Sequence, residues 1–201
     1  MVTRLLRVDG GATIRTVSRR TKGLSVSTAG TIRDAIEAAS DHLRDHPDAA
    51  RSTDSLATAT LVEGLVVKVT GPDDETITTD MVPSVGGTAS APSPGWLLRA
   101  AEASCVATLI AMRAAMLAVQ LTDLEVSADS ESDDRGLLGM DADVPAGPLS
   151  GRIVVRLAAL GTDDATLEAI ARWGITHCPV HDALERAVPV AHDIKISSGS
   201  R

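Results

Sequence analysis

The chain has 201 residues, a net charge of −8 at neutral pH and 44% hydrophobic residues. The acidic balance argues against general binding to nucleic acid or anionic membranes, and the length suffices for one well-packed core or two small ones. Trp96 and Trp173 are the only aromatic residues, so a core of Leu, Val, Ile, Ala and Met must be thin, which favours an oligomer.

The chain carries no clear targeting signal. We find no apolar run of membrane-spanning length and no signal-peptide core in the basic N-terminal residues, so we expect no membrane span and a cytoplasmic location. The two cysteines, Cys105 and Cys178, are too few for a disulfide scaffold. A disulfide between them in the cytoplasm would be transient and catalytic.

The first 54 residues are predicted to form a basic arm and one helix. Residues 1–24 hold six basic residues and one acidic residue, a composition typical of a solvated arm. From Thr31 onward, Ile32, Ala35, Ile36, Ala39 and Leu43 recur at helical spacing. Pro47 is predicted to end this helix.

The middle of the chain predicts strands followed by a long helix. Residues 55–83 are rich in Thr and Val and predict two or three strands, with a turn at residues 71–74. The two glycines at 86–87 and the two prolines at 92 and 94 predict a rigid loop. Ser93 is a suitable N-cap and Pro94 a suitable first residue for a helix that runs to about Val119.

The last third predicts two strands, two helices and a closing strand. In chain order we first expect a strand at 121–130, an acidic loop at Asp129–Gly147 and a strand at 152–160. A helix at 165–177 follows, capped by Thr162, Asp163 and Asp164. Cys178 and Pro179 then begin a short helix, and a closing strand is expected at 188–196. Strands in blocks indicate an α+β fold with mostly antiparallel pairing.

Cys105 is predicted to lie on or beside the buried face of the long helix. A free cysteine there is often a packing residue, and burial without a cation or hydrogen-bond donor leaves a thiol inert. Glu102 lies one turn earlier on the same side. A bare carboxylate would disfavour the thiolate, and it would help only by anchoring an Arg from elsewhere.

Cys178 is predicted at the N-cap of a short helix, where free N–H groups and the helix dipole favour a thiolate. Metal binding by His177, Cys178 and His181, with His192, is an alternative, but the spacing matches no strong zinc motif. The acidic loop lacks the Gly and Glu positions of a calcium loop. We therefore expect no metal and no cofactor.

The ordered set of motifs resembles the OsmC/Ohr family, the osmotically inducible protein C and organic hydroperoxide resistance proteins. The segment VGGTASAPSPGWLLRAAEASC is followed by a strand, a long loop, a strand, a helix and HCPV. The resemblance covers roughly residues 55–196. It divides the chain into an extension at 1–54, an OsmC-like domain at 55–196 and a tail at 197–201.

The resemblance implies an intertwined homodimer, with antiparallel sheets wrapped around long central helices. It also implies a peroxidase that acts on organic hydroperoxides. Cys105 would be the peroxidatic thiolate and become a sulfenic acid, and Cys178 would resolve it as a disulfide. A dithiol, such as a lipoyl group on a protein, would reopen that disulfide.

Two positions depart from the family's peroxidase pattern. Where such members carry a Glu ten places before the first Cys, this chain has Gly95, and residues 56–69 contain no Arg to hold the thiolate. Glu102 is a candidate substitute for the Glu, and Arg99, Arg113 or an N-terminal Arg for the cation. The competing hypothesis is a non-catalytic module that binds an apolar small molecule at the dimer interface, in a pocket lined by Leu, Met and Trp96.

Overall fold

A central helix organises the computed structural model, which describes residues 26–197, with side chains from residue 29 onward. This helix, α2 (Pro94–Met116), begins as predicted, and the Trp96 N–H donates to the Ser93 hydroxyl at 3.2 Å. It ends earlier than predicted because Ala118 adopts a left-handed conformation with φ of 56°. The Val119 N–H then bonds to the Ala114 carbonyl at 2.8 Å, which closes a Schellman-type cap.

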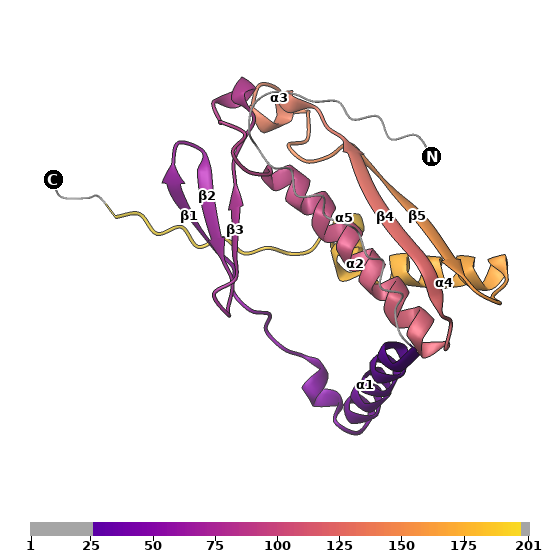
Figure 1. The fold of residues 1–201 in the computed structure, drawn as a ribbon. Coiled ribbons are helices and arrows are strands. Elements are labelled where there is room, and N and C mark those ends of the chain that lie inside the picture. Colours follow the sequence, from indigo (N-terminus) through magenta and orange to yellow (C-terminus); the bar gives the residue numbers. More distant parts are fainter. Residues whose placement is uncertain (1–25, 198–201) are drawn as a thin grey trace, which may run out of the picture.

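The C-terminal half packs on α2. Strands β4 (Leu121–Glu131) and β5 (Ser150–Ala159) form an antiparallel pair, and helices α4 (Asp164–Thr176) and α5 (Pro179–Glu185) also contact α2 (Figure 1). Asp163 caps α4 by accepting the Thr166 N–H at 2.8 Å. The core lies where these elements meet and consists of Val106, Ile110, Ala114, Ile170 and Cys178.

A second sheet precedes α2. Strands β1 (Thr58–Glu63), β2 (Val66–Thr70) and β3 (Thr76–Thr79) pair in sequence order, all antiparallel, which confirms three strands and the turn at 71–74 (Figure 1). Leu61 pairs with Val67, and Val69 pairs with Ile77. Because paired residues share a face, these apolar side chains lie on one side of the sheet. Leu61 and Ile77 remain 66% and 50% exposed.

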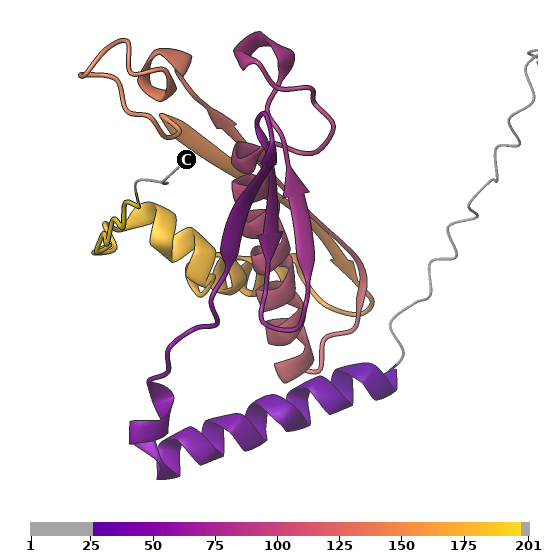
Figure 2. The same cartoon turned by 90° about the vertical axis from the view of Figure 1, so that its left-hand side faces the viewer.

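The helix near the N-terminus crosses the C-terminal end of α2 (Figure 2). This helix, α1 (Val26–Asp45), begins five residues before the predicted Thr31. The earlier start places Ala29 and Gly30 beside the cavity between α1 and the end of α2. A 3-10 turn (Pro47–Ala50) follows, in line with the predicted end at Pro47. The predicted basic arm at 1–24 lies outside the described residues.

Two predictions about the C-terminal half were wrong. Residues 188–197 have no regular structure, so the closing strand is absent from the described chain, and Ile194 and Ile196 are 81% and 90% exposed. A strand needs a partner for its N–H and C=O groups, and no neighbouring strand edge pairs with this segment. The acidic loop is also shifted from its predicted bounds, because β4 continues through Glu131 and β5 begins at Ser150, and it contains the short helix α3 (Asp134–Leu137).

Within the described residues, the long helix α2 has the length and overall composition of a membrane span. Length and composition alone do not identify a span. Arg99, Glu102 and Arg113 interrupt it, and it packs against β4 and α4. These contacts identify α2 as the central helix of the fold.

Candidate functional site

The fold brings the two cysteines together. Cys105 lies midway along α2 and is half-buried, whereas Cys178 lies at the α4–α5 junction and is fully buried. Cys105 packs against the core cluster that contains Cys178, and it lies close enough to help raise the pKa of the Cys178 thiol. Both are free thiols. The two cysteines, 73 positions apart in the sequence, are therefore neighbours in the fold.

The predicted N-cap position of Cys178 is confirmed, but the pKa of its thiol is raised overall. Cys178 does cap α5, and its sulfur accepts the His181 backbone N–H at 3.4 Å. Burial nevertheless raises the pKa of the Cys178 thiol, and the Cys105 side chain raises it further, while the N–H groups of His181 and Val180 only partly offset this. Desolvation thus outweighs the short helix, and Cys178 is a protonated thiol at neutral pH.

Glu102 is buried beside the thiols, but its partner differs from the predicted one. Its Oε1 lies 2.9 Å from Nδ1 of His181, with side-chain exposures of 12% and 20%. The predicted role was to anchor an Arg. A histidine from the helix that carries Cys178 occupies that place instead.

The candidate cations on α2 are engaged elsewhere. Arg99 donates to the Ser130 hydroxyl at 3.2 Å, and the Arg113 guanidinium lies 5.2 Å from the ring centre of Trp173. Within residues 29–197, no Arg or Lys side chain donates a hydrogen bond to either sulfur. Neither arginine therefore replaces the cation that the family pattern supplies.

The metal alternative also finds no support in the geometry. His177 stacks on Trp173 and its Nδ1 lies 2.8 Å from the carbonyl of that residue, while His181 pairs with Glu102. Across the described residues, no three His, Cys, Asp or Glu side chains are grouped to hold a metal ion.

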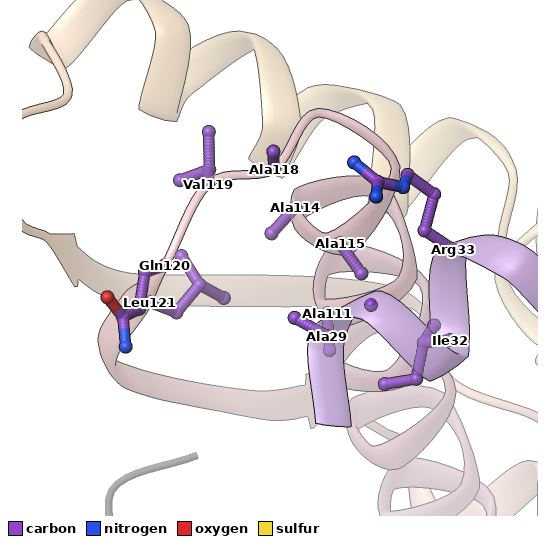
Figure 3. A pocket seen from close by; sticks show the side chains of 11 residues that line it. Ala29, Ile32, Arg33, Ala111, Ala114, Ala115, Ala118, Val119, Gln120 and Leu121 are labelled. Carbon is purple, nitrogen blue, oxygen red and sulfur yellow. The ribbon is translucent and has the colours of Figure 1, made fainter. Parts of the chain in front are cut away.

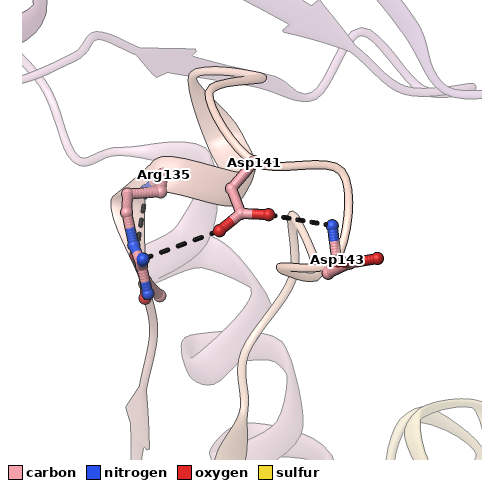
Figure 4. Close-up of polar contacts among 4 residues, drawn as sticks. Arg135, Asp141 and Asp143 are labelled. Carbon is pink, nitrogen blue, oxygen red and sulfur yellow. Dashed lines mark hydrogen bonds and ion pairs between the residues drawn. The ribbon is translucent and has the colours of Figure 1, made fainter.

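Arg135 forms ion pairs that hold the acidic loop together. Arg135 donates to both carboxylate oxygens of Asp133 and lies 3.6 Å from Asp141, which accepts the Asp143 N–H at 3.1 Å (Figure 4). These contacts neutralise part of the acidic charge and fold the loop between β4 and β5 on itself.

Two cavities flank the ends of α2. The larger, about 510 Å³, opens beside the Glu102–His181 pair and is also lined by Arg99, Leu149, Ile153 and Leu184. The smaller, about 210 Å³, lies between α1 and the C-terminal end of α2, where alanines face Ile32 and Arg33 (Figure 3). Trp96, predicted to line a pocket, is half exposed and lines neither cavity.

A buried carboxylate fixes the loop that leads into α2. Asp80 is 1% exposed and accepts hydrogen bonds from the backbone N–H groups of Met81, Thr88 and Ser90 and from the hydroxyls of Thr88 and Ser90. A Cβ on Gly87 would lie 2.0 Å from the Met81 carbonyl oxygen. Only glycine fits there, which gives the predicted rigid loop its physical basis.

Sequence reasoning missed the roles of His181 and Asp80. The spacing offered one signal for His181, because it follows Cys178 by three residues and Glu102 precedes Cys105 by three. The separation of the two helices along the chain hid their contact. Nothing in the sequence around Asp80 distinguishes it from the other acidic residues.

Comparisons with known proteins agree with this geometry. Residues 87–193 match the family model described as OsmC-like protein. A search of curated proteins found no match. Among solved structures, an OsmC-like protein from Mycoplasma pneumoniae has a TM-score of 0.58 at 17% identity, over 68% of this chain and 91% of that one.

Two further structures carry the name of organic hydroperoxide resistance proteins. The one from Legionella pneumophila has a TM-score of 0.50 at 18% identity, over 67% of this chain and 90% of that one. The one from Elizabethkingia anophelis has a TM-score of 0.51 at 14% identity, over 68% and 91%. At these identities the likeness shows the fold.

Proposed function

The chain belongs to the OsmC-like protein family, and from this premise we propose that it is a thiol-dependent peroxidase that reduces organic hydroperoxides. The family and the names of its structural neighbours support a peroxide-related redox role. The observation that carries the specific proposal is that Cys105 on α2 packs against the core cluster that contains Cys178, the N-cap of α5.

The proposed reaction has three balanced steps. The Cys105 thiolate attacks the distal oxygen of the hydroperoxide; the O–O bond breaks, and protonation of the leaving alkoxide releases an alcohol and leaves a sulfenic acid. The Cys178 thiol then attacks the Cys105 sulfur, which forms the disulfide and releases water. A dithiol reductant, for which we propose a lipoyl group, reduces the disulfide and itself becomes a disulfide.

The burial pattern suits this division of roles. Cys105 is the more accessible of the two sulfurs, as the thiol that meets the peroxide must be. Cys178 is buried and its pKa is raised, so it stays a thiol until the sulfenic acid forms beside it. The larger cavity opens one helical turn from Cys105, at Glu102, and offers an entry for an organic substrate.

We further propose that the active form is a homodimer in the cytoplasm, formed by the OsmC-like domain at 55–196. The apolar face of the β1–β2–β3 sheet is largely exposed, and α2 buries only five of its residues within one protomer. A second copy would cover both surfaces. The same contact would place further charged groups near Cys105, where residues 29–197 of one protomer provide no hydrogen-bonded cation.

Single-turnover kinetics test the peroxidase. Stopped-flow mixing of the reduced protein with cumene hydroperoxide should oxidise Cys105 far faster than a free thiol, followed by loss of both thiols as the disulfide forms. Cys105→Ser should abolish the reaction, whereas Cys178→Ser should react once and accumulate a sulfenic acid that dimedone traps. Oxidation of the wild type no faster than that of free cysteine would refute the proposal.

The alternative is a module that binds an apolar small molecule, predicted at the dimer interface. The smaller cavity offers a different place for such a ligand, within one protomer, because most of its lining residues are alanine, valine, leucine or isoleucine. This function predicts that an apolar ligand raises the melting temperature of a Cys105→Ala variant as much as that of the wild type. Absence of any shift across a panel of apolar ligands would count against it.

A further inference from the structure

One short polar contact joins the two helices that carry the cysteines. Glu102 lies three residues before Cys105 on α2, and His181 lies three residues after Cys178 on α5. Oε1 of Glu102 and Nδ1 of His181 are 2.9 Å apart. Each residue thus lies one turn from a cysteine on its own helix, and the contact between them joins the two helices at the edge of the larger cavity.

A carboxylate lies close to each ring nitrogen of His181. Its Nδ1 is within hydrogen-bonding distance of buried Glu102, and its Nε2 lies 3.3 Å from Oε1 of Glu185, an exposed carboxylate. These two contacts fix the orientation of the imidazole ring between α2 and the rest of α5.

The backbone of His181 connects this contact to the thiol. Its N–H donates to the Cys178 sulfur at 3.4 Å, so the residue that binds α2 through its ring also orients the sulfur through its amide. α5 has only seven residues and is followed by chain without regular structure. Val180 on the same helix packs against the core, and among the described side chains of α5, His181 is the one that hydrogen-bonds to α2.

We propose that Glu102 and His181 are positioning residues that hold the Cys178 sulfur against Cys105 and so set how readily the disulfide closes. The proposal rests on the proposed function for its biological meaning. The proposal itself concerns only the equilibrium between the two thiols and their disulfide, which can be measured without a peroxide. A disulfide requires a specific distance and dihedral angle, so it forms far less readily when the two sulfur atoms are displaced from each other.

Equilibration of the full-length protein with oxidised and reduced dithiothreitol tests the proposal. Oxidised dithiothreitol takes two electrons from Cys105 and Cys178, and the ratio at half-conversion gives the closure constant. We expect Glu102→Leu and His181→Leu to lower this constant about ten- to a hundredfold, as small misplacements of reacting groups do. Arg186→Leu, which breaks an exposed ion pair with Asp182 on the same helix, should leave it unchanged.

The double variant Glu102→Leu/His181→Leu guards against loss of folding, because it leaves no buried unpaired charge. We expect this double variant to form the disulfide as poorly as the single variants and still to unfold cooperatively on heating. A double variant that folds and closes its disulfide like the wild type would overturn the proposal, since a merely structural pair would affect the melting temperature alone. A slow reaction with cumene hydroperoxide would refute the peroxidase and leave this result standing.

Discussion

Asp80 shows how one buried carboxylate can position a helix. Five hydrogen bonds from Met81, Thr88 and Ser90 converge on it, and they hold the pKa of the Asp80 carboxyl well below its usual range, with the Thr88 hydroxyl as the largest cause. The Asp80 N–H in turn donates to the Pro92 carbonyl at 3.2 Å, just before the Ser93 cap of α2. The carboxylate therefore connects the end of β3 to the start of the helix that carries Cys105.

The lowered pKa of Asp80 predicts a loss of stability in acid. The folded state binds the proton on Asp80 more weakly than the unfolded state, whose carboxyl titrates at about 3.9, so this contribution is complete above about pH 5 and falls as the pH drops below it. Melting temperatures measured from pH 7 to pH 3 should fall steeply for the wild type. Asp80→Asn should melt several degrees lower at pH 7 and show a shallower fall.

Asp34→Asn provides the matched control for Asp80. Asp34 lies on α1 with its side chain 74% exposed and makes only a long contact of 3.8 Å to Arg33. Its replacement should leave the melting curve and its pH dependence unchanged. Equal pH dependence in the wild type and Asp80→Asn would show that the buried carboxylate does not contribute the acid sensitivity.

The candidate site was only partly predictable at the residue level. Motif order directed attention to Cys105, Cys178 and Glu102, and all three lie together in the structure. The partner of Glu102 was not predictable, because the pairing with His181 depends on how α5 packs against α2. The N-cap position of Cys178 was predictable because it depends on local sequence, whereas the burial that raises the pKa of its thiol is a property of the fold.

At the scale of elements, the crossing of α2 and α4 determines where Cys178 lies. Gly174 on α4 meets Ile110 on α2 so closely that a Cβ on Gly174 would lie 2.4 Å from the Ile110 side chain and 2.9 Å from its backbone nitrogen. The absence of a side chain lets the helices approach, and the chain then turns at Cys178 into α5. The sequence predicted both helices, but not that a glycine within one of them sets their separation.

Gly174→Ala should therefore force the two helices apart. We expect a loss of about 1–3 kcal/mol in the free energy of unfolding, as for other overpacked cores, and a lower closure constant for the Cys105–Cys178 disulfide. Gly30→Ala on α1 is the opposite case, since no atom lies within 4 Å of the added Cβ. It should raise stability by up to about 1 kcal/mol through helix propensity. Urea unfolding of both variants measures the contrast, and a neutral Gly174→Ala would disprove the close crossing.

Element boundaries followed the sequence where local signals dominate and departed from it where distant contacts decide. Ser93, Pro94 and Asp163 cap their helices as local chemistry predicts. The predicted strand at 188–196 alternates in the right way, yet within the described residues it pairs with no other strand. Alternation shows that a segment can join a sheet, but whether it does depends on how the rest of the chain places it against a strand edge.

At the scale of the whole molecule, the β1–β2–β3 sheet presents an apolar face of the kind found at subunit interfaces. Its registers place Ala59, Leu61, Val67, Val69 and Ile77 on one face and mostly threonines on the other. The apolar face has a core-like composition but stays largely exposed. An apolar patch of this kind on a single protomer marks a binding surface. Together with the thin core of α2, it is the main physical argument for a homodimer.

The two faces of β3 allow a direct test of the dimer. Ile77 and Thr78 are neighbours that point to opposite sides of the sheet, so Ile77→Asp places a charge on the apolar face and Thr78→Asp places the same charge on the polar face. Sedimentation should give the wild type twice the protomer mass of 20.8 kDa. Ile77→Asp should shift the protein toward monomer or lower its melting temperature, because burial of an unpaired carboxylate is costly, whereas Thr78→Asp should behave like the wild type. A monomeric wild type, or identical behaviour of the two variants, would exclude this face as the dimer interface.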